Sequence, residues 1–422
     1  MKITSTPVGV LLAAAIVTTT AAPPTQAQAL PPLEYTLSSV NPLSSVITGL
    51  PSYTGSTVFD LLSVPLASSS LLSQVPMLAV PSLLLAILGR SLFGTALYQG
   101  VGSTGSALSS AITDATATFP DPDAPPAEFV SLEHMVDDRY ELTVYSPSMQ
   151  REVKNDILLP GGVDNTEPRP TFYLMLGADG AADGFSWHGN TDYEEFFADK
   201  HVNVVTPKGS VSSMQADWYS TDPTTGANKW LTYMTKELPP LIDAHFNGTG
   251  RDAIAGISMS GGPAISMAGF DPERFAAAGS YSGCPATTGL IGGAWTSSAV
   301  LMNEGNPVNM WGLPGDEAWV AHSPVLNLDA LENTAVFVSA SMGVPGEIDG
   351  GTDLSSRVKR LGFPMLMEGG AYACSAHFAN EARNAGVDVD WFEVPEGTHT
   401  WGLFELEMRT SWRTIGPAIG VE

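Results

Sequence analysis

Apolar and polar positions follow two alternating patterns through the C-terminal part of the chain. Six short, largely apolar runs indicate strands: residues 171–176, 202–206, 252–257, 275–281, 335–340 and 387–394. Longer segments lie between them, and residues 227–246 place five apolar side chains on roughly one helical face: Leu231, Met234, Leu238, Leu241 and Ile242. Strands that alternate with helices predict a mostly parallel sheet with helices on both sides.

The third of these runs leads into Gly256-Ile257-Ser258-Met259-Ser260, and a segment of small residues with helical character follows it. Strand, sharp turn and helix around a central serine are typical of a nucleophile elbow, whose strained turn exposes the serine hydroxyl. The usual pattern is Gly-x-Ser-x-Gly. Here Ser260 replaces the last glycine, with Gly261 and Gly262 directly behind. Ser258 is therefore a candidate nucleophile that needs a histidine and an acid further along the chain.

A candidate histidine follows the last predicted strand. His399 lies in the loop Pro395-Glu396-Gly397-Thr398-His399, where the general base of an α/β-hydrolase is expected. A histidine suits this role because its pKa near neutrality lets it take the serine proton and return it later. The acid is open on this reasoning, because four carboxylates have suitable positions: Glu347, Asp349, Asp353 and Glu368.

The oxyanion formed during acyl transfer needs two backbone N–H donors. One is expected from Met259, the residue after the nucleophile. The other is expected from Ala178, in the segment Gly177-Ala178-Asp179-Gly180 that follows the first predicted strand. Glycines in this segment let the backbone approach a substrate closely.

Composition narrows the class of protein. The 422 residues include 18 basic and 44 acidic side chains, for a formal net charge of −26. Such a balance argues against binding nucleic acid, because a phosphate backbone needs a cationic surface. The chain has neither a Walker-type phosphate loop nor a Cys/His cluster with zinc spacing.

The N-terminal third differs from the rest. Residues 1–29 resemble a secretory signal, with Lys2, an apolar core over 8–17 and the cleavage motif Ala27-Gln28-Ala29. Residues 30–126 are rich in Ser, Leu, Ala, Gly and Pro, are almost free of charge, and end in a proline-rich linker. We expect this extension to be a low-complexity leader, to pack on the catalytic domain, or to associate with an outer lipid layer. The catalytic domain is assigned to residues 127–422.

Many short motifs, in one order, resemble the antigen 85 mycolyltransferases of mycolic-acid bacteria and their corynebacterial relatives, most closely the corynebacterial type. The resemblance extends from about residue 145 to 412. The matching segments are residues 146–151, 176–178, 187, 190–191, 203–209, 216–219, 256–259, 310–312, 318–319 and 397–401. It implies a secreted or cell-envelope enzyme with an α/β-hydrolase fold and no metal or cofactor.

The resemblance also implies a reaction and selects an acid. The family moves a long 2-alkyl-3-hydroxy acyl chain from a trehalose monomycolate to a second trehalose ester or to cell-wall arabinan. Its acid is a glutamate some thirty residues before the histidine, which matches Glu368, 31 residues before His399. The expected substrate-binding residues are Gly177, Asp179, Trp187, Asp217, Trp218 and Trp401. Asp179 stands where mycobacterial members carry an arginine that helps to hold trehalose, so the sugar contacts are expected to differ.

Cys284 and Cys374 are the only cysteines, and the resemblance to the corynebacterial members predicts a disulfide between them. The bridge would close a 90-residue loop and fix the segment that carries Glu368.

Two other functions fit the same residues. One is a secreted esterase or lipase that hydrolyses acyl esters with the same triad. The other is a cell-wall binding protein on an inactive hydrolase scaffold.

Overall fold

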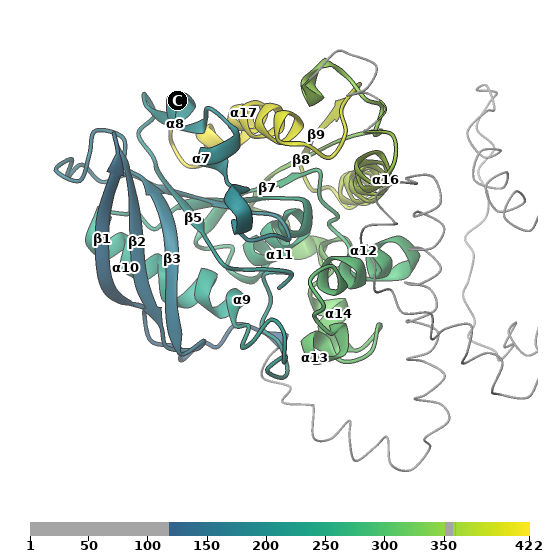
Figure 1. Ribbon diagram of the computed structural model, residues 1–422, viewed down its shortest axis with the longest axis horizontal. Helices are drawn as coiled ribbons and strands as arrows, with labels where there is room; N and C mark the ends of the chain where they lie inside the picture. Colours follow the sequence, from purple (N-terminus) through teal and green to yellow (C-terminus); the bar gives the residue numbers. More distant parts are fainter. Residues whose placement is uncertain (1–117, 351–357, 359) are drawn as a thin grey trace, which may run out of the picture. The chain divides into compact units, whose positions relative to one another are not determined.

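The computed structural model describes residues 118–350, 358 and 360–422 (Figure 1). The expected signal sequence, residues 30–117 of the low-charge extension and Asp353 lie outside this range. None of the helices in the described part is both long enough and apolar enough to cross a membrane.

A single mixed sheet forms the centre of the described part, with strand order β1-β2-β3-β5-β4-β6-β7-β8-β9. Three antiparallel strands form one edge: β1 (Glu128–Val136), β2 (Arg139–Ser146) and β3 (Arg151–Leu158). Strand β3 pairs antiparallel with β5, and the remaining pairs are parallel. The parallel strands are β4 (Thr171–Met175), β5 (Asn203–Pro207), β6 (Asp252–Ile257), β7 (Phe275–Tyr281), β8 (Ala335–Ser341) and β9 (Val389–Val394).

The predicted α/β architecture is confirmed, and each of the six predicted strands begins and ends within two residues of its expected position. Strands β1 to β3 were not among the predictions. Most side chains of β1 are exposed, and β2 and β3 interleave charged residues with apolar ones, so none of them forms an apolar run. They extend the parallel sheet at an edge where one face meets solvent.

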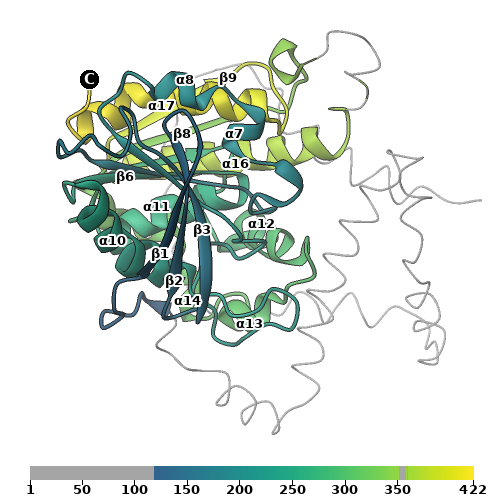
Figure 2. The same cartoon turned by 60° about the vertical axis from the view of Figure 1, so that its left-hand side comes forward.

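Helices cover both faces because successive strand residues point to opposite sides. Tyr173 and Met175 of β4 pack with α10 (Leu238–Phe246), α11 (Gly261–Phe270) and α16 (Phe363–Asn384). Phe172 and Leu174 pack on the other side with α7 (Trp187–Asn190), α8 (Tyr193–Phe197) and α17 (Trp401–Ala418). Figure 2 shows the sheet between α10 and α11 on one side and α8 and α17 on the other.

The helical segment predicted at 227–246 is present as three consecutive pieces: α9 (Trp230–Thr232), a π-helical turn η3 (Tyr233–Glu237) and α10. Pro239 and Pro240 explain the interruption, because neither has an N–H to donate to the preceding turn.

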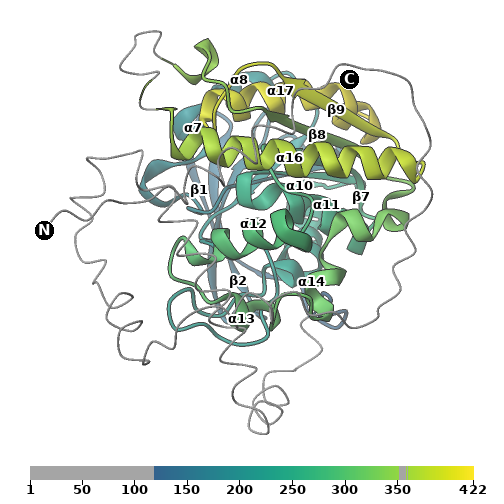
Figure 3. The ribbon, with the colours of Figure 1, turned by 90° about the vertical axis from the view of Figure 1, so that its right-hand side faces the viewer.

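Three further helices lie between β7 and β8 in the chain: α12 (Gly289–Leu301), α13 (Pro307–Trp311) and α14 (Glu317–Ala321). Their apolar side chains form one buried cluster with Met214, Trp218 and Met259, the residue after the candidate nucleophile. Figure 3 shows α12 running beside the long helix α16.

Residues 118–121, at the start of the described chain, are attached to the catalytic body. The Thr118 carbonyl lies 2.9 Å from Nε2 of the buried His322, and the Asp121 N–H donates to the Thr232 hydroxyl at 2.9 Å. The boundary at residue 127 remains a prediction.

Candidate active site

Ser258 occupies a strained turn at the carboxyl end of β6. Its φ is +53°, a left-handed conformation that is uncommon for a residue with a side chain. It begins the short helix η4 (Ser258–Ser260), which leads directly into α11. The glycines around it are required sterically, because a Cβ on Gly256 would lie 2.5 Å from the Ser260 carbonyl oxygen and one on Gly262 would lie 2.2 Å from the Cys284 carbonyl oxygen.

Ser260, which replaces the usual second glycine, has its own partners. Its hydroxyl donates to the carbonyl of Leu176, the residue after β4, and accepts a hydrogen bond from Gln215 Nε2 at 3.0 Å. The substitution therefore links the elbow to the strand beside it. Gln215 was not among the predicted site residues, because a glutamine in a loop carries no distinguishing pattern.

The side chains of Ser258, His399 and Glu368 form a continuous hydrogen-bonded chain. Ser258 Oγ lies 2.8 Å from His399 Nε2, and His399 Nδ1 lies 2.8 Å from Glu368 Oε2. Ser258 and His399 are partly exposed, whereas Glu368 is fully buried. This arrangement can move a proton between the serine and the imidazole while the carboxylate fixes the ring.

His399 is held from several directions. The Phe404 ring packs edge-on against the imidazole at 5.0 Å between centroids, and Trp295 lies at 6.2 Å. The backbone on both sides is fixed by Asp349, whose Oδ1 accepts 2.8 Å hydrogen bonds from the Thr398 N–H and hydroxyl and from the Thr400 hydroxyl.

Of the three candidate acids that the structure describes, Glu368 is the one that bonds to the imidazole. It lies on α16, and its second oxygen, Oε1, accepts from the Ser341 N–H at 2.8 Å. Glu347 is exposed on the short helix η7 (Glu347–Asp349), and Asp349 bonds to the residues flanking the histidine.

A second carboxyl group, Glu407 of α17, lies behind Glu368. Both groups are fully buried, and the Ser282 hydroxyl lies between them, 2.9 Å from Glu368 Oε1 and 3.0 and 3.1 Å from the oxygens of Glu407. Burial, and then the negative charge of Glu368, raise the pKa of Glu407 well above its usual value. Glu407 was not among the predicted site residues, because the sequence of an amphipathic helix ordinarily predicts that its glutamates are exposed to solvent.

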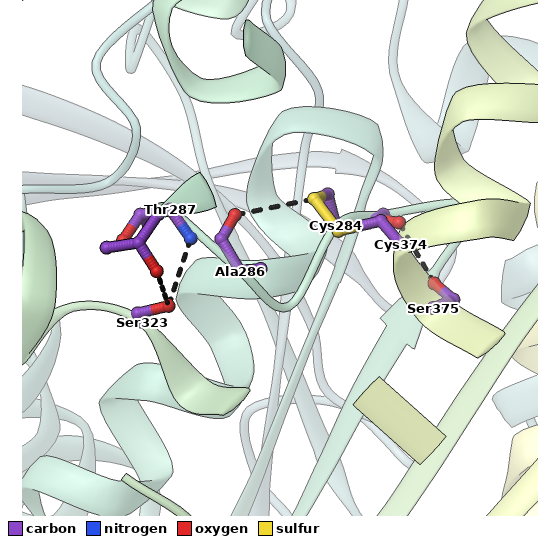
Figure 4. The surroundings of a disulfide bond; sticks show 8 residues. Cys284, Ala286, Thr287, Ser323, Cys374 and Ser375 are labelled. Carbon is purple, nitrogen blue, oxygen red and sulfur yellow. Dashed lines mark hydrogen bonds between the residues drawn. A yellow bond between two sulfur atoms is a disulfide. The ribbon is translucent and has the colours of Figure 1, made fainter. Parts of the chain in front are cut away.

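The predicted disulfide between Cys284 and Cys374 is confirmed, with a Cα–Cα distance of 5.0 Å (Figure 4). It joins the turn after β7 to α16, six residues beyond Glu368. Beside it, the Ser375 hydroxyl donates to the Gly283 carbonyl at 3.0 Å. The helix that carries the acid is therefore fixed to the centre of the sheet by a covalent bond.

The expected oxyanion donors follow neighbouring strands. Strands β4 and β6 pair in parallel, with Met175 opposite Gly256, so Ala178 and Met259 follow their adjacent carboxyl ends. Gly177 lies against the nucleophile, since a Cβ built on it would be 3.5 Å from Ser258 Cβ.

The predicted substrate-binding residues separate into two groups. Asp217, Trp218 and Trp187 are interior residues with at most 2% of their surface exposed. The Asp217 carboxylate bonds to the Thr232 N–H and hydroxyl, the Trp218 indole N–H donates to the Ser213 carbonyl, and Trp187 packs edge-on against Trp401. Gly177 is also buried, but it contacts Ser258, whereas Asp179 and Trp401 are partly exposed.

Exposed apolar side chains lie on the segments next to the histidine loop. The Gly397 N–H donates to the Val344 carbonyl at 2.6 Å, and the His399 N–H donates to the Pro364 carbonyl at 3.4 Å. Five exposed apolar residues belong to these two segments, and we call them the apolar rim: Met342, Val344, Leu361, Phe363 and Leu366.

Several known proteins are similar to this chain. The family described as "Putative esterase" matches residues 146–414. The chain is 30% identical over 290 residues to diacylglycerol acyltransferase/mycolyltransferase Ag85A of Mycobacterium tuberculosis, covering 66% of this chain and 81% of that protein. It is 31% identical over 285 residues to Ag85B of Mycolicibacterium smegmatis, covering 64% and 81%.

Among solved structures, Mycobacterium tuberculosis MPT51 (FbpC1) superposes with a TM-score of 0.55 at 25% identity, covering 67% of this chain and all of that one. An S-formylglutathione hydrolase from Agrobacterium tumefaciens shares the fold, with a TM-score of 0.50 at 15% identity, covering 69% and 100%.

Proposed function

The chain belongs to the antigen 85 mycolyltransferase family, within the esterase family that matches residues 146–414, and we propose that it transfers a mycolyl-type acyl group from trehalose monomycolate to a second sugar hydroxyl. The serine acyltransferase/esterase class follows from membership of the family. The acyl donor and the acceptor, another trehalose monomycolate or cell-wall arabinogalactan, are the proposed part.

The hydrogen-bonded chain from Ser258 through His399 to Glu368 is the observation that carries the proposal. In the first half-reaction His399 Nε2 takes the Ser258 proton as Oγ attacks the acyl carbonyl carbon. The N–H groups of Met259 and Ala178 stabilise the oxyanion. When the ester bond breaks, His399 gives its proton to the departing trehalose oxygen, and the acyl group remains on Ser258.

The second half-reaction uses the same groups in reverse. A hydroxyl of the acceptor sugar loses its proton to His399 as it attacks the acyl-enzyme, and Ser258 Oγ leaves and recovers that proton. Glu368 stays ionised throughout and stabilises the imidazolium that forms in each half-reaction.

Substrate contacts are proposed for exposed and partly exposed groups on the segments that adjoin the serine and the histidine loop. The apolar rim suits a long acyl chain, because apolar surface gains free energy on leaving water. Asp179 and Trp401 are the proposed sugar contacts, since a carboxylate accepts hydrogen bonds from sugar hydroxyls and an indole face packs on a sugar ring.

Incubation of the purified full chain with trehalose monomycolate tests the proposal. We expect trehalose dimycolate and free trehalose to form, and we expect both to be lost in Ser258→Ala. Release of free mycolic acid without dimycolate would instead favour the esterase. Water can attack the same acyl-enzyme in place of a sugar hydroxyl. The S-formylglutathione hydrolase described above shares the fold, so hydrolysis is the specific alternative.

The binding-protein alternative is tested separately with a serine-reactive fluorophosphonate. Labelling of the native chain that is absent in Ser258→Ala supports an enzyme. Failure of the native chain to label would favour the binding role.

Export to the cell envelope is also proposed, on the signal-like residues 1–29. N-terminal sequencing of the protein recovered outside the cytoplasm should begin at Leu30. Recovery with Met1 intact would contradict cleavage at this site.

A further inference from the structure

Ser282 has two carboxyl neighbours but only one proton to donate. Its hydroxyl lies within hydrogen-bonding distance of Glu368 Oε1 and of both oxygens of Glu407. A hydroxyl donates one hydrogen bond and accepts up to two, so it cannot serve two ionised carboxylates at the same time. If both groups were ionised, one of them would lose this donor in a fully buried site.

Among the residues that the structure describes, no cation pairs with Glu407 to compensate a second negative charge. Within the described residues, none of the ion pairs involves Glu407, and Glu368 pairs with His399 alone. The other groups that act on Glu407 are neutral donors, the Ser339 hydroxyl of β8 and the Ser282 backbone N–H, and they only partly offset the effect of burial. Two buried carboxylates that have only one histidine partner between them repel each other, which favours a proton on one of them.

The proton belongs on Glu407. Glu368 Oε2 accepts from the imidazole and its Oε1 accepts from the Ser341 N–H, so both of its oxygens have donors. We infer that Glu407 is a neutral carboxylic acid that donates to Ser282 Oγ, so that the Ser282 hydroxyl donates to Glu368 Oε1. Glu407 thereby acts as a positioning residue for Glu368 and, through it, for His399. The inference rests on the proposed catalytic role of this chain of residues.

The backbone supports a dedicated role for Ser282. Its φ is +46°, a strained conformation that persists only where the surroundings impose it. The adjacent Gly283 and the elbow residue Gly261 are packed so tightly that a Cβ on either would lie 2.5 Å from Ser280 Oγ. The hydroxyl is therefore held at a fixed place between the two carboxyl groups.

The protonation state can be read directly from the full-length protein, independently of activity. At pH 7 the infrared spectrum should contain the carbonyl stretch of a buried neutral carboxylic acid. This band should disappear in Glu407→Gln and remain in Glu405→Gln, a control on the same helix whose side chain pairs with Arg409. A spectrum without the band, or a band that survives Glu407→Gln, would overturn the inference while leaving the proposed transferase intact.

Two reactions of Ser258 test the positioning role: phosphonylation by a fluorophosphonate, with loss of fluoride, and turnover of a short ester through the acyl-enzyme. Glu407→Gln keeps a neutral donor, so its rate should be within about threefold of the wild type. Glu407→Leu should lower kcat for the ester about tenfold and leave KM unchanged, because one hydrogen bond to a charged pair is lost. In a Ser282→Ala background the Gln and Leu variants should be equally active, because the link is gone. Equal activity of Gln and Leu with Ser282 present, at equal melting temperatures, would refute the role. Loss of labelling only in Ser258→Ala, whatever happens at residue 407, would still support the proposed function.

Discussion

Asp349 positions His399 through the residues on either side of it. Its carboxylate accepts hydrogen bonds from Thr398 and Thr400 and, through Oδ2, from the Gly346 N–H at 2.9 Å. Burial by itself would raise the pKa of Asp349, but these hydrogen bonds outweigh it and leave the pKa below its ordinary value. The acid that touches the imidazole and the acid that fixes its loop are therefore two different residues.

Replacing Asp349 by Ala should weaken both the loop and the reaction. Several hydrogen bonds to a charged acceptor are lost and their donors are left buried, so we expect the free energy of unfolding to fall by about 2–4 kcal/mol. The rate of fluorophosphonate labelling at Ser258 should fall as well. Denaturant unfolding and labelling rates check both effects, with Glu347→Gln on the same short helix as the control. An Asp349→Ala protein as stable and reactive as that control would contradict the assignment.

Glu368→Gln should remove most of the activity and leave the fold intact. An amide of the same shape can hold the imidazole but does not stabilise the imidazolium and favours the wrong tautomer, for which a loss of about 10³- to 10⁴-fold in kcat is typical. Single-turnover acylation measures the effect, with Glu405→Gln as the matched control. Retention of activity in Glu368→Gln would mean that another carboxylate serves as the acid.

The disulfide should contribute strongly to stability. Closing the 90-residue loop between Cys284 and Cys374 is worth about 4–5 kcal/mol in the chain-entropy model. Reduction, or the double change of both cysteines to serine, should therefore lower the melting temperature and slow acylation, because α16 carries Glu368. Alkylation of the denatured, unreduced protein should leave its mass unchanged, whereas two alkyl adducts would exclude the bridge.

Asp217 should make stability depend on pH in a defined window. Burial raises its pKa to about 6, against hydrogen bonds from Thr232, so the folded state holds a proton that the unfolded aspartate, with a pKa of about 3.9, has released. The stability that this bound proton contributes is complete below pH 4 and is lost as the pH rises through 6. Denaturant unfolding at pH 4 and at pH 7 measures the effect. The free energy of unfolding of Asp217→Asn, relative to that of the wild type, should be about 2–3 kcal/mol higher at pH 7 than at pH 4. Asp388→Asn, at an exposed position, should show no such change, and parallel behaviour of the two variants would contradict the assignment.

The sequence predicted the parts of this fold whose patterns are local. Buried parallel strands form apolar runs, and the elbow around Ser258 has its own turn chemistry, so both could be recognised without long-range information. The choice of Glu368 among four carboxylates came from the family resemblance. Spacing alone could not show that α16 turns this residue toward His399 while Asp349 faces the flanking threonines.

Burial accounts for most of what the sequence could not supply. Asp217, Trp218 and Trp187 belong to motifs shared with the family and were expected at the substrate, but all three are interior residues whose partners are other protein groups. Glu407, in contrast, belongs to no recognisable motif. Its role depends on residues that are distant in the chain, so the local sequence did not indicate it. A motif records which residues recur together and does not record which way they face.

The hydroxyl of Ser260 ties the turn that carries the nucleophile to Leu176, two residues before the proposed oxyanion donor Ala178. Nucleophile and donor thus belong to one preorganised frame, and binding energy from a long acyl chain is not needed to bring them together. The length of the acyl chain should therefore change mainly the affinity for the substrate, because even a small ester meets a fully assembled reaction centre.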